Sequence, residues 1–416
     1  MTEITERPRD ARSPRSGPPK LSRRAALLGL TAAWSLGPVS LALADPAPGA
    51  APADKRFVVV ILRGALDGLA AVVPYGDRDL QTWRAPLLLE AGIGQPGGLL
   101  DLGGFYGLHP ALGGMHGLYG AGELLPIHAV AGSYRSRSHF EAQDYLESGA
   151  DQRLTSGWLN RVVGAIPPMQ AQPDGDGLAI GLSTPLLLRG PARIGTYAPD
   201  SSQGPSPDLY ARIAALNARD RLTGPAIADG LAGMGFSAQT LGGPAPHGAG
   251  AFPSLARAAG HLLAAADGPR IAALELGGWD THAAQKQRLN GPLTQLDSGL
   301  MALKDGLGAA WKDTAVLVMT EFGRTVRVNG TNGTDHGTAT VAFLAGGAVA
   351  GGRVGGTWPG LGASRLFENR DLAPTTDLRS VAKGMLASHL GLGQSALDRV
   401  FPSSGSASPS GGLIRA

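Results

Sequence analysis

Six short runs of apolar residues constrain the fold more than any other feature of this sequence. They lie at Phe57–Leu62, Leu124–Ala131, Gly177–Leu182, Arg270–Leu276, Thr314–Thr320 and Ala339–Ala345. Helical patterns alternate with these runs, and apolar strands that alternate with helices are typical of a parallel sheet covered on both faces. The sequence therefore predicts an α/β fold with a mainly parallel central sheet sandwiched between helices.

The clearest helical pattern runs from about Gln285 to Ala310. Its leucines advance in alternating steps of four and three residues, which places them on one apolar stripe of a helix. These leucines are Leu289, Leu293, Leu296, Leu300, Leu303 and Leu307. We expect the stripe to be core, with Pro292 either kinking the helix or marking its first turn. Further helices are expected at Phe140–Ser148, Pro207–Arg219, Ser254–Ala266 and Asp377–Leu390.

The first 44 residues have the composition of an export signal. They hold seven basic and three acidic residues, the run Ser22-Arg23-Arg24-Ala25-Ala26-Leu27-Leu28 and an apolar stretch from Ala25 to Leu43. The run resembles a twin-arginine consensus, and Ala42-Leu43-Ala44 offers a small-x-small cleavage site. An uncleaved membrane anchor is the alternative. We expect cleavage after Ala44, export by the twin-arginine machinery, and a periplasmic or cell-surface location.

The sequence predicts that the rest of the chain forms one domain with a short tail. Residues 45–401 contain all six predicted strands and would form the α/β domain. Within it, the stretch 183–253 is rich in Gly, Pro and Ser and is expected to form a cap or long loops. Residues 402–416 have a similar composition and are expected to be a disordered tail.

Charge and cysteine content exclude several classes of protein. The chain has 36 basic and 33 acidic residues, but without the leader it has 29 against 30. A basic field over the folded domain is therefore absent, and nucleic acid is not an expected partner. No second apolar run reaches membrane length, so we expect no stable membrane span after cleavage. Cysteine is absent, so any metal must be held by oxygen and imidazole ligands.

Polar residues gather near the ends of the predicted strands, where the loops of an open parallel sheet converge on ligands. Asp67, on a Gly-rich turn after the first strand, could reach a metal or make an ordinary Asp-Gly turn. Ser138 precedes an expected helix, whose dipole and free amides favour an anion. A capping box formed by Ser138 and Glu141 is the alternative. Arg135 and Arg137 could bind the same anion.

Two loops combine an acid with a histidine. Asp280 and His282, two residues apart after a predicted strand, could bind one cation, and a helix cap at Asp280 is the alternative. Asp335 and His336 lie between glycines just before another strand, where such a pair is more often a ligand or catalytic pair than core. Carboxylate and imidazole ligands together suit zinc, manganese or iron.

One acidic residue, Glu321, directly follows the predicted strand Thr314–Thr320. A carboxylate at a buried strand end is costly unless it is paired, so Glu321 needs a cation. Arg324 could be that cation, and a metal ion is the functional alternative.

Three of these segments, together with the leader, resemble a family of exported bacterial proteins known as DUF1501. The segments are Gly277-Gly278-Trp279-Asp280-Thr281-His282, Thr320-Glu321-Phe322-Gly323-Arg324 and Gly333-Thr334-Asp335-His336-Gly337. Leu372–Arg379 resembles the C-terminal stretch of that family. The family is similar in plan to the alkaline phosphatase and sulfatase superfamily, whose members hold two metals at strand ends and use a Ser or Thr nucleophile. The resemblance implies an alkaline-phosphatase-like fold.

The resemblance also implies roles for individual residues. Asp67 matches the metal-binding acid after the first strand, and Ser138 matches the nucleophile at a helix start. Asp280, with His282 nearby, matches the acid of the second metal, and His336 resembles the late histidine that completes it.

Two features depart from the superfamily pattern, and one of them is the Asp280–His282 spacing, which is shorter than usual. Glu321 stands where the superfamily has an Asp-His pair, and Phe322 replaces the histidine. In an alternative correspondence, Asp335 and His336 form that pair and Glu321 lies outside the site.

The leading hypothesis is an exported hydrolase of phosphate or related esters, small or polymeric, that uses one or two divalent ions of zinc, manganese or iron. Ser138 would be the nucleophile, and Arg137 and Arg324 would hold the anionic oxygens. The alternative is a non-catalytic binding protein of the cell envelope that keeps the hydrolase fold. A metal-free serine esterase ranks last, since no Gly-x-Ser-x-Gly elbow occurs.

Overall fold

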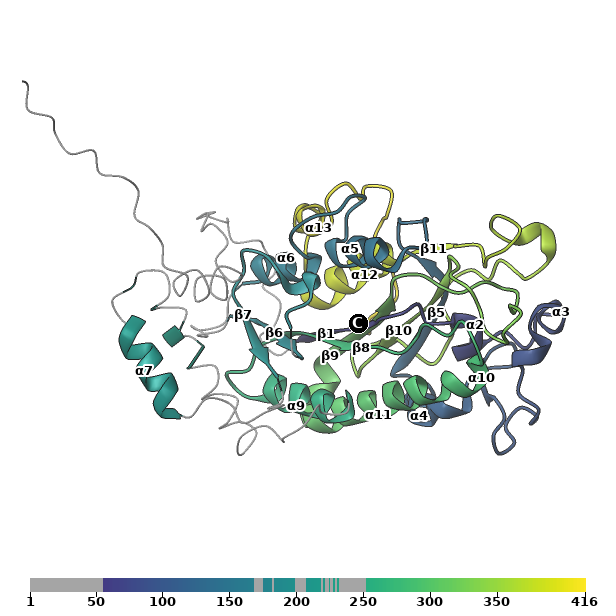
Figure 1. Ribbon diagram of the computed structural model, residues 1–416, viewed down its shortest axis with the longest axis horizontal. Helices are drawn as coiled ribbons and strands as arrows, with labels where there is room; N and C mark the ends of the chain where they lie inside the picture. Colours follow the sequence, from purple (N-terminus) through teal and green to yellow (C-terminus); the bar gives the residue numbers. More distant parts are fainter. Residues whose placement is uncertain are drawn as a thin grey trace, which may run out of the picture. The chain divides into compact units, whose positions relative to one another are not determined.

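An eight-stranded sheet runs through the part of the chain that this computed structural model describes, which comprises residues 55–167, 175–181, 183–198, 207–217 and 252–416 with isolated positions between 220 and 231. Its strand order is β11-β5-β10-β9-β1-β8-β6-β7 (Figure 1). The bounds are β1 Arg56–Leu62, β5 Leu124–Ala131, β6 Gly177–Ile180, β7 Ile194–Tyr197, β8 Ile271–Leu276, β9 Thr314–Thr320, β10 Thr340–Ala345 and β11 Thr376–Asp377.

Strand direction confirms the prediction of a mainly parallel sheet, with one exception. β1 lies parallel to both of its neighbours, β8 and β9, and β6 lies parallel to β7 and β8. β10 runs antiparallel to β9 and to β5. The loop 321–339 between β9 and β10 contains no helix, and a parallel return would need a crossover. The loop therefore stays at the carboxyl edge of β9.

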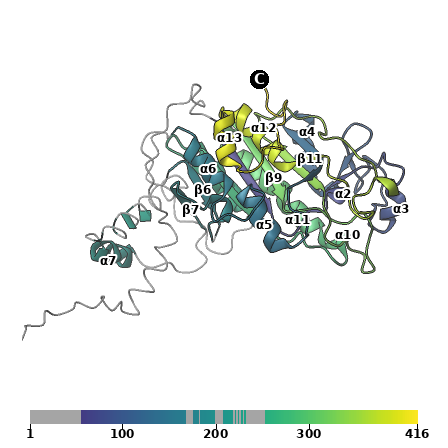
Figure 2. The same cartoon turned by 90° about the horizontal axis from the view of Figure 1, so that it is seen from above.

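Helices cover both faces of the sheet (Figure 1). α4, α9 and α11 lie on one face, and α5, α6, α12 and α13 lie on the other; Figure 2 views the molecule from the side of α12 and α13. Side chains of β1 alternate accordingly, with Val58 and Val60 in one hydrophobic cluster and Val59 and Ile61 in the other. The bounds are α2 Gly68–Ala71, α3 Leu80–Arg84, α4 Gly113–Gly120, α5 His139–Ser148, α6 Trp158–Ala165, α7 Pro207–Asn217, α9 Phe252–Ala264, α10 Gln285–Arg288, α11 Asn290–Leu307, α12 Leu378–Leu390 and α13 Gln394–Val400.

The predicted leucine stripe is confirmed as core. All six leucines are at most 2% exposed, and α11 begins at Asn290, so Pro292 lies in its first turn. α11 packs closely on α9. A Cβ added at Gly306 would lie 2.3 Å from the carbonyl oxygen of Arg257, so a side chain at this position would separate the two helices.

The prediction of a disordered tail at 402–416 is wrong. The ammonium group of Lys383, itself only 1% exposed, donates hydrogen bonds to the carbonyls of Ser404 (2.8 Å) and Ala407 (2.9 Å). The Leu413 side chain is buried, and its carbonyl accepts a hydrogen bond from Ala350. A buried cation must be hydrogen-bonded, so this segment is ordered despite its Ser- and Gly-rich composition.

The predicted cap at 183–253 divides into three parts. Residues 183–198 belong to the main sheet through β7, and residues 207–217 form α7. Most of the remainder lies outside the described residues, as does the predicted leader at 1–44. Across the described segments, no helix combines the length and the apolarity needed to cross a membrane.

The part of the chain that connects β1 to α4 forms a second sheet of three strands. Its strands are β2 Val72–Val73, β3 Leu100–Asp101 and β4 Gly107–Leu108, in the order β2-β4-β3. Two-residue strands carry no periodicity, which is why the sequence pattern did not predict them.

Candidate metal centre

Three histidines bring their Nε2 atoms together at the carboxyl edge of the main sheet. His139 begins α5, His282 follows β8, and His336 lies in the loop before β10. The Nε2 atom of His336 lies 3.0 Å from that of His139 and 2.9 Å from that of His282. Three distant parts of the sequence therefore place imidazole nitrogens within contact distance.

The other ring nitrogen of each histidine faces a hydrogen-bond acceptor. The pairs are His139 Nδ1 with Glu321 Oε1 (2.8 Å), His282 Nδ1 with Asp335 Oδ1 (3.2 Å) and His336 Nδ1 with the Arg137 carbonyl oxygen (2.9 Å). An acceptor at Nδ1 places the proton of a neutral imidazole there and leaves a lone pair on Nε2. With all three rings in this neutral form, the Nε2 lone pairs face one another as they would around a cation.

Asp280 places a carboxylate oxygen close to these ring nitrogens. Its Oδ1 atom lies 3.0 Å from His282 Nε2, 3.4 Å from His336 Nε2 and 3.6 Å from His139 Nε2. Ligand atoms bound tetrahedrally to zinc at their usual bond lengths are about 3.3 Å apart. The ligand atoms of His139, Asp280 and His336 all lie within 4.8 Å of one another. The donor set of imidazoles and one carboxylate therefore fits zinc or a similar transition metal.

Hydrogen bonds keep the acids of this centre ionised. Burial opposes ionisation of Glu321, but hydrogen bonds from His139, Gln143 and Thr320 outweigh it and hold the pKa of that carboxyl below its usual value. In the same way, the Arg324 guanidinium overcomes the effect of burial on Asp280 and lowers its pKa.

Hydrogen bonds and burial also shift the pKa values of Asp335, His139 and His336. The pKa of Asp335 is lowered chiefly by a hydrogen bond from Asn329. The hydrogen bond to Glu321 raises the pKa of His139, whereas burial lowers the pKa of His336. At neutral pH the centre therefore combines ionised carboxylates with a His336 ring that favours the neutral, metal-binding form.

Arg324 ties the surrounding loops together. Its buried guanidinium donates to the carbonyls of Ala65 (2.9 Å), Gly64 (2.6 Å), Thr334 (3.1 Å) and Trp279 (3.2 Å), and to Asp280 Oδ1. These carbonyls come from the loops after β1 and β8 and before β10. In this structure Arg324 therefore donates its hydrogen bonds to acceptors within the protein. The sequence predicted that it would hold oxygens of the substrate.

Arg137 contributes through its backbone. It has a left-handed conformation (φ +61°), and its carbonyl oxygen accepts the hydrogen bond from His336 Nδ1. Its guanidinium pairs with the fully buried Asp371 (Nε to Oδ2, 2.9 Å) and with Glu368. These two ion pairs fix the position of the Arg137 side chain. The predicted role of this side chain in binding an anion stays a prediction, because in this structure its guanidinium is paired within the protein.

Asp67 is placed elsewhere. Its side chain is 1% exposed and caps α2 by accepting a hydrogen bond from the Leu69 N–H. Its Oδ2 atom accepts hydrogen bonds from Arg84 and from Gln285 Nε2, each at 2.5 Å. A buried carboxylate needs a cation, and here the equally buried Arg84 supplies it. The structure does not bring Asp67 into the group of ligand atoms, contrary to the sequence prediction.

Ser138 occupies the predicted position at the start of α5, directly before His139. Among the described contacts, its side chain makes no capping hydrogen bond to the helix. Glu141 accepts instead from the hydroxyl of Tyr134, so the alternative capping box is not formed. The hydroxyl of Ser138, at a half-buried position, is therefore not committed to the helix start.

Sequence reasoning missed His139 and Gln143. They are four residues apart, so they share a face of α5, and both donate to Glu321 Oε1, at 2.8 Å and 3.1 Å. A histidine and an amide at this spacing, at the start of a helix that follows a strand, was the available signal. Glu321, predicted as a metal ligand, contacts His139 Nδ1 and does not lie among the converging Nε2 atoms.

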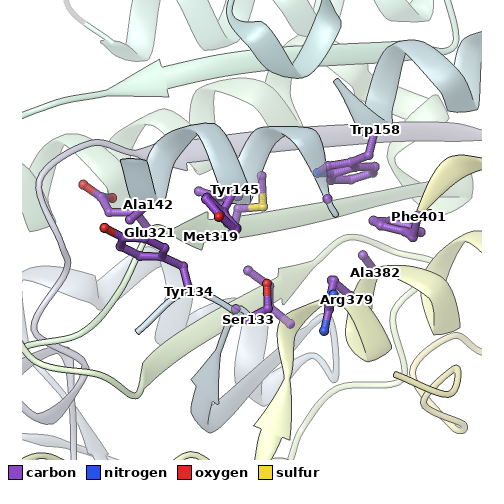
Figure 3. A pocket seen from close by; sticks show the side chains of 14 residues that line it. Ser133, Tyr134, Ala142, Tyr145, Trp158, Met319, Glu321, Arg379, Ala382 and Phe401 are labelled. Carbon is purple, nitrogen blue, oxygen red and sulfur yellow. The ribbon is translucent and has the colours of Figure 1, made fainter. Parts of the chain in front are cut away.

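A narrow cavity lies behind Glu321 and is shown in Figure 3. Its volume is about 30 Å³, and its lining is mostly apolar. Tyr134 and Glu321 lie at one end of the view, and Trp158 and Phe401 at the other (Figure 3). A space of this size holds about one water molecule, so it does not accommodate a substrate.

This chain is similar to several solved structures. Ps i-CgsB in complex with k-i-k-neocarrahexaose is 10% identical, with 85% of this chain and 77% of that chain covered and a TM-score of 0.38. The C-terminal periplasmic domain of EcEptC from Escherichia coli, in complex with Zn, is 10% identical over 86% and 91% of the two chains, with a TM-score of 0.34. A protein in the alkaline phosphatase superfamily from Vibrio parahaemolyticus is 12% identical over 79% and 69%, with a TM-score of 0.27.

These values are too low to transfer a residue role or an activity. Comparison with curated protein sequences gives no match. The family profile described as "Protein of unknown function (DUF1501)" matches residues 119–401, which is more than half of the chain. The chain therefore belongs to the DUF1501 family.

Proposed function

We propose that this protein is an exported, metal-dependent hydrolase of phosphate or related esters. The observation that supports the proposal most is the convergence of three Nε2 lone pairs and the Asp280 carboxylate at one edge of the sheet. Lone pairs about 3 Å apart repel one another unless a proton or a metal cation lies between them. Carboxylate or carbonyl acceptors behind metal-binding histidines are usual in metalloproteins.

The ligands would be His139, His282, His336 and Asp280. A divalent ion held there would supply a Lewis acid for an anionic ester oxygen. Ser138 would be the nucleophile, because it directly precedes His139 at the amino end of α5, where the helix dipole favours an oxyanion. Glu321 and Asp335 would keep the histidine rings in the tautomer that leaves Nε2 free.

Metal content and turnover test this proposal together. Exported protein, purified without chelators, should contain one zinc, manganese or iron ion per chain by elemental mass spectrometry. It should hydrolyse members of a panel of phosphate mono- and diesters. Folded wild-type protein without metal would refute the proposal.

The variant Ser138→Ala should lose turnover but keep its metal. Ser136→Ala is the matched control, because Ser136 is exposed in the same loop, and it should keep both. Unchanged turnover in Ser138→Ala would remove Ser138 as nucleophile.

One observation favours the second candidate, a metal-containing binding protein without catalysis. The guanidiniums of Arg137 and Arg324, the two expected anion-holding groups, are both bonded to acceptors within the protein. Wild-type protein that binds metal and a phosphate ester but does not hydrolyse it would support this candidate.

A further inference from the structure

The loop 321–339 packs directly on the backbone of His282. The N–H of Thr334 donates a hydrogen bond to the carbonyl of Thr281, one residue before His282 (3.2 Å). A Cβ added at Gly333 would lie 2.2 Å from the His282 carbonyl, so this close approach requires glycine. The two loops that carry candidate metal ligands are therefore in contact with each other.

Asn329, a half-buried residue of the same loop, uses its whole side-chain amide in this contact. Its Nδ2 atom donates to the His282 carbonyl oxygen (2.9 Å) and to Asp335 Oδ1 (3.1 Å). Its Oδ1 atom accepts from the Thr331 N–H (3.0 Å), the Thr331 hydroxyl (2.9 Å) and the Gly333 N–H (2.9 Å). One amide thus closes the turn of its own loop and reaches the loop of His282.

The orientation of the Asn329 amide follows from its neighbours. Two backbone N–H groups face Oδ1 and two oxygen acceptors face Nδ2, so a flipped amide would lose four hydrogen bonds. Aspartate has the same shape, but its second oxygen would face the His282 carbonyl and the Asp335 carboxylate. The position therefore requires an amide.

The Asp335 side chain depends on this amide for its orientation. It is 53% exposed, and its Oδ1 atom is the acceptor that faces His282 Nδ1 at 3.2 Å. An exposed carboxylate can rotate and exchange such a partner for water, so a pair of this kind is weak by itself. The Asn329 contact to the same oxygen keeps it at the histidine ring.

We infer that Asn329 is a positioning residue of the metal centre. It holds Asp335 Oδ1 at His282 Nδ1 and fixes the His282 backbone, so that Nε2 of this ring stays aimed at the other ligand atoms. The inference rests on the metal-binding part of the proposed function, and it is tested by metal binding without turnover. A protein that binds zinc but hydrolyses no ester would refute the proposed hydrolase and leave this inference standing.

The variant Asn329→Asp separates the two donor contacts from the turn. It keeps an oxygen for the Thr331 and Gly333 N–H groups and replaces Nδ2 by an acceptor. Asn332→Asp is the matched control, because Asn332 is exposed in the same loop, also precedes a glycine and has no side-chain hydrogen bond to any residue that the structure describes. Both variants gain one negative charge, which by itself would strengthen the binding of a cation. Weaker binding by Asn329→Asp would therefore report the loss of the donors.

Competition with a chromophoric chelator measures the zinc affinity of both metal-free variants. Asn329→Asp should bind zinc about tenfold more weakly than Asn332→Asp, the lower end of the usual effect of partners behind metal ligands. The visible absorption of bound Co²⁺ reports coordination geometry, so it should change in Asn329→Asp and match the wild type in the control. Equal zinc affinities in the two variants, or a Co²⁺ spectrum that Asn329→Asp leaves unchanged, would overturn the inference.

A second comparison shows whether Asn329 acts through Asp335. In an Asp335→Ala background the carboxylate that Asn329 orients is absent, so Asn329→Asp should cost less zinc affinity there than in the wild type. An equal cost in both backgrounds would also overturn the inference. Thermal unfolding by circular dichroism shows whether each metal-free variant is folded, and Asn329→Ser with Asn332→Ser replaces the pair if Asn329→Asp is not.

Discussion

Replacing Glu321 by Gln should weaken metal binding without disturbing the fold. The Glu321 side chain is fully buried, and its Oε1 atom accepts hydrogen bonds from the Gly64 N–H (2.9 Å), His139 Nδ1 (2.8 Å) and Gln143 Nε2 (3.1 Å). Its Oε2 atom accepts from the Thr320 hydroxyl (2.8 Å). Glutamine has the same shape, and an amide oxygen at the Oε1 position keeps the three N–H bonds. The substitution therefore removes a charge and leaves the packing intact.

The size of the effect follows from these contacts. A charge-assisted hydrogen bond is roughly twice as strong as a neutral one, so the bond that orients His139 loses strength while its geometry is kept. Substitution of a partner behind a metal-binding histidine costs about 10- to 100-fold in metal affinity, or about 1.4–2.7 kcal/mol. We expect Glu321→Gln to fall in this range.

Competition with a chromophoric chelator measures zinc affinity directly on metal-free protein. Glu141→Gln is the matched control, because Glu141 is an exposed acid of the same helix that bonds to Tyr134 and not to a histidine. Its zinc affinity should equal that of the wild type. If Glu321→Gln and the wild type bind zinc equally, the carboxylate behind His139 does not contribute to metal binding, and our account of the centre is refuted.

Three further predictions concern support of the centre and stability. Asp371→Asn removes the buried charge that holds Arg137, and it should lower zinc affinity by up to about tenfold in the same assay; an unchanged affinity would contradict the role of this ion pair. Gly306→Ala should lower the free energy of unfolding by about 1–3 kcal/mol in urea, because its Cβ meets a backbone carbonyl of α9. Gly291→Ala, in the same helix with open space around it, should not be destabilising. Burial lowers the pKa of His389 to about 4, so below pH 6.5 the unfolded chain binds a proton that the folded chain does not. Its contribution to stability is complete above pH 6.5 and is lost as the pH falls to 4, by at most about 3 kcal/mol. His389→Gln should remove this part of the pH dependence in urea unfolding, and an unchanged slope would count against it.

The sheet was largely predictable because its strands are buried on both faces. β5 and β9 have the predicted bounds, since each is a fully buried, mostly apolar run flanked by acidic residues or glycine. The antiparallel direction of β10 was not predictable, because side-chain pattern does not encode strand direction. The ordered segment 402–416 was also missed, since its stability depends on a lysine about twenty residues earlier in the chain.

The candidate site was predictable in location but only partly in its members. Asp280, His282 and His336 were found because an acid or imidazole in a loop at a strand end stands out against Gly-rich neighbours. The pairing of Asp67 with Arg84 depends on tertiary contact and could not be inferred from spacing. The role of Arg137 lies in a backbone carbonyl, which every residue has, so residue type gave no signal.

The Arg324 contacts have a consequence for the thermodynamics of ligand binding. One guanidinium holds carbonyls of the loops at Gly64, Trp279 and Thr334, so these loops are ordered when the chain folds. Fixing a residue costs about 1–2 kcal/mol in conformational entropy, and a ligand that must order its own site binds more weakly by that amount. Here the entropy of the three loops is already lost before a ligand arrives. The free energy of ligand binding at the centre therefore does not include a cost for ordering these three loops.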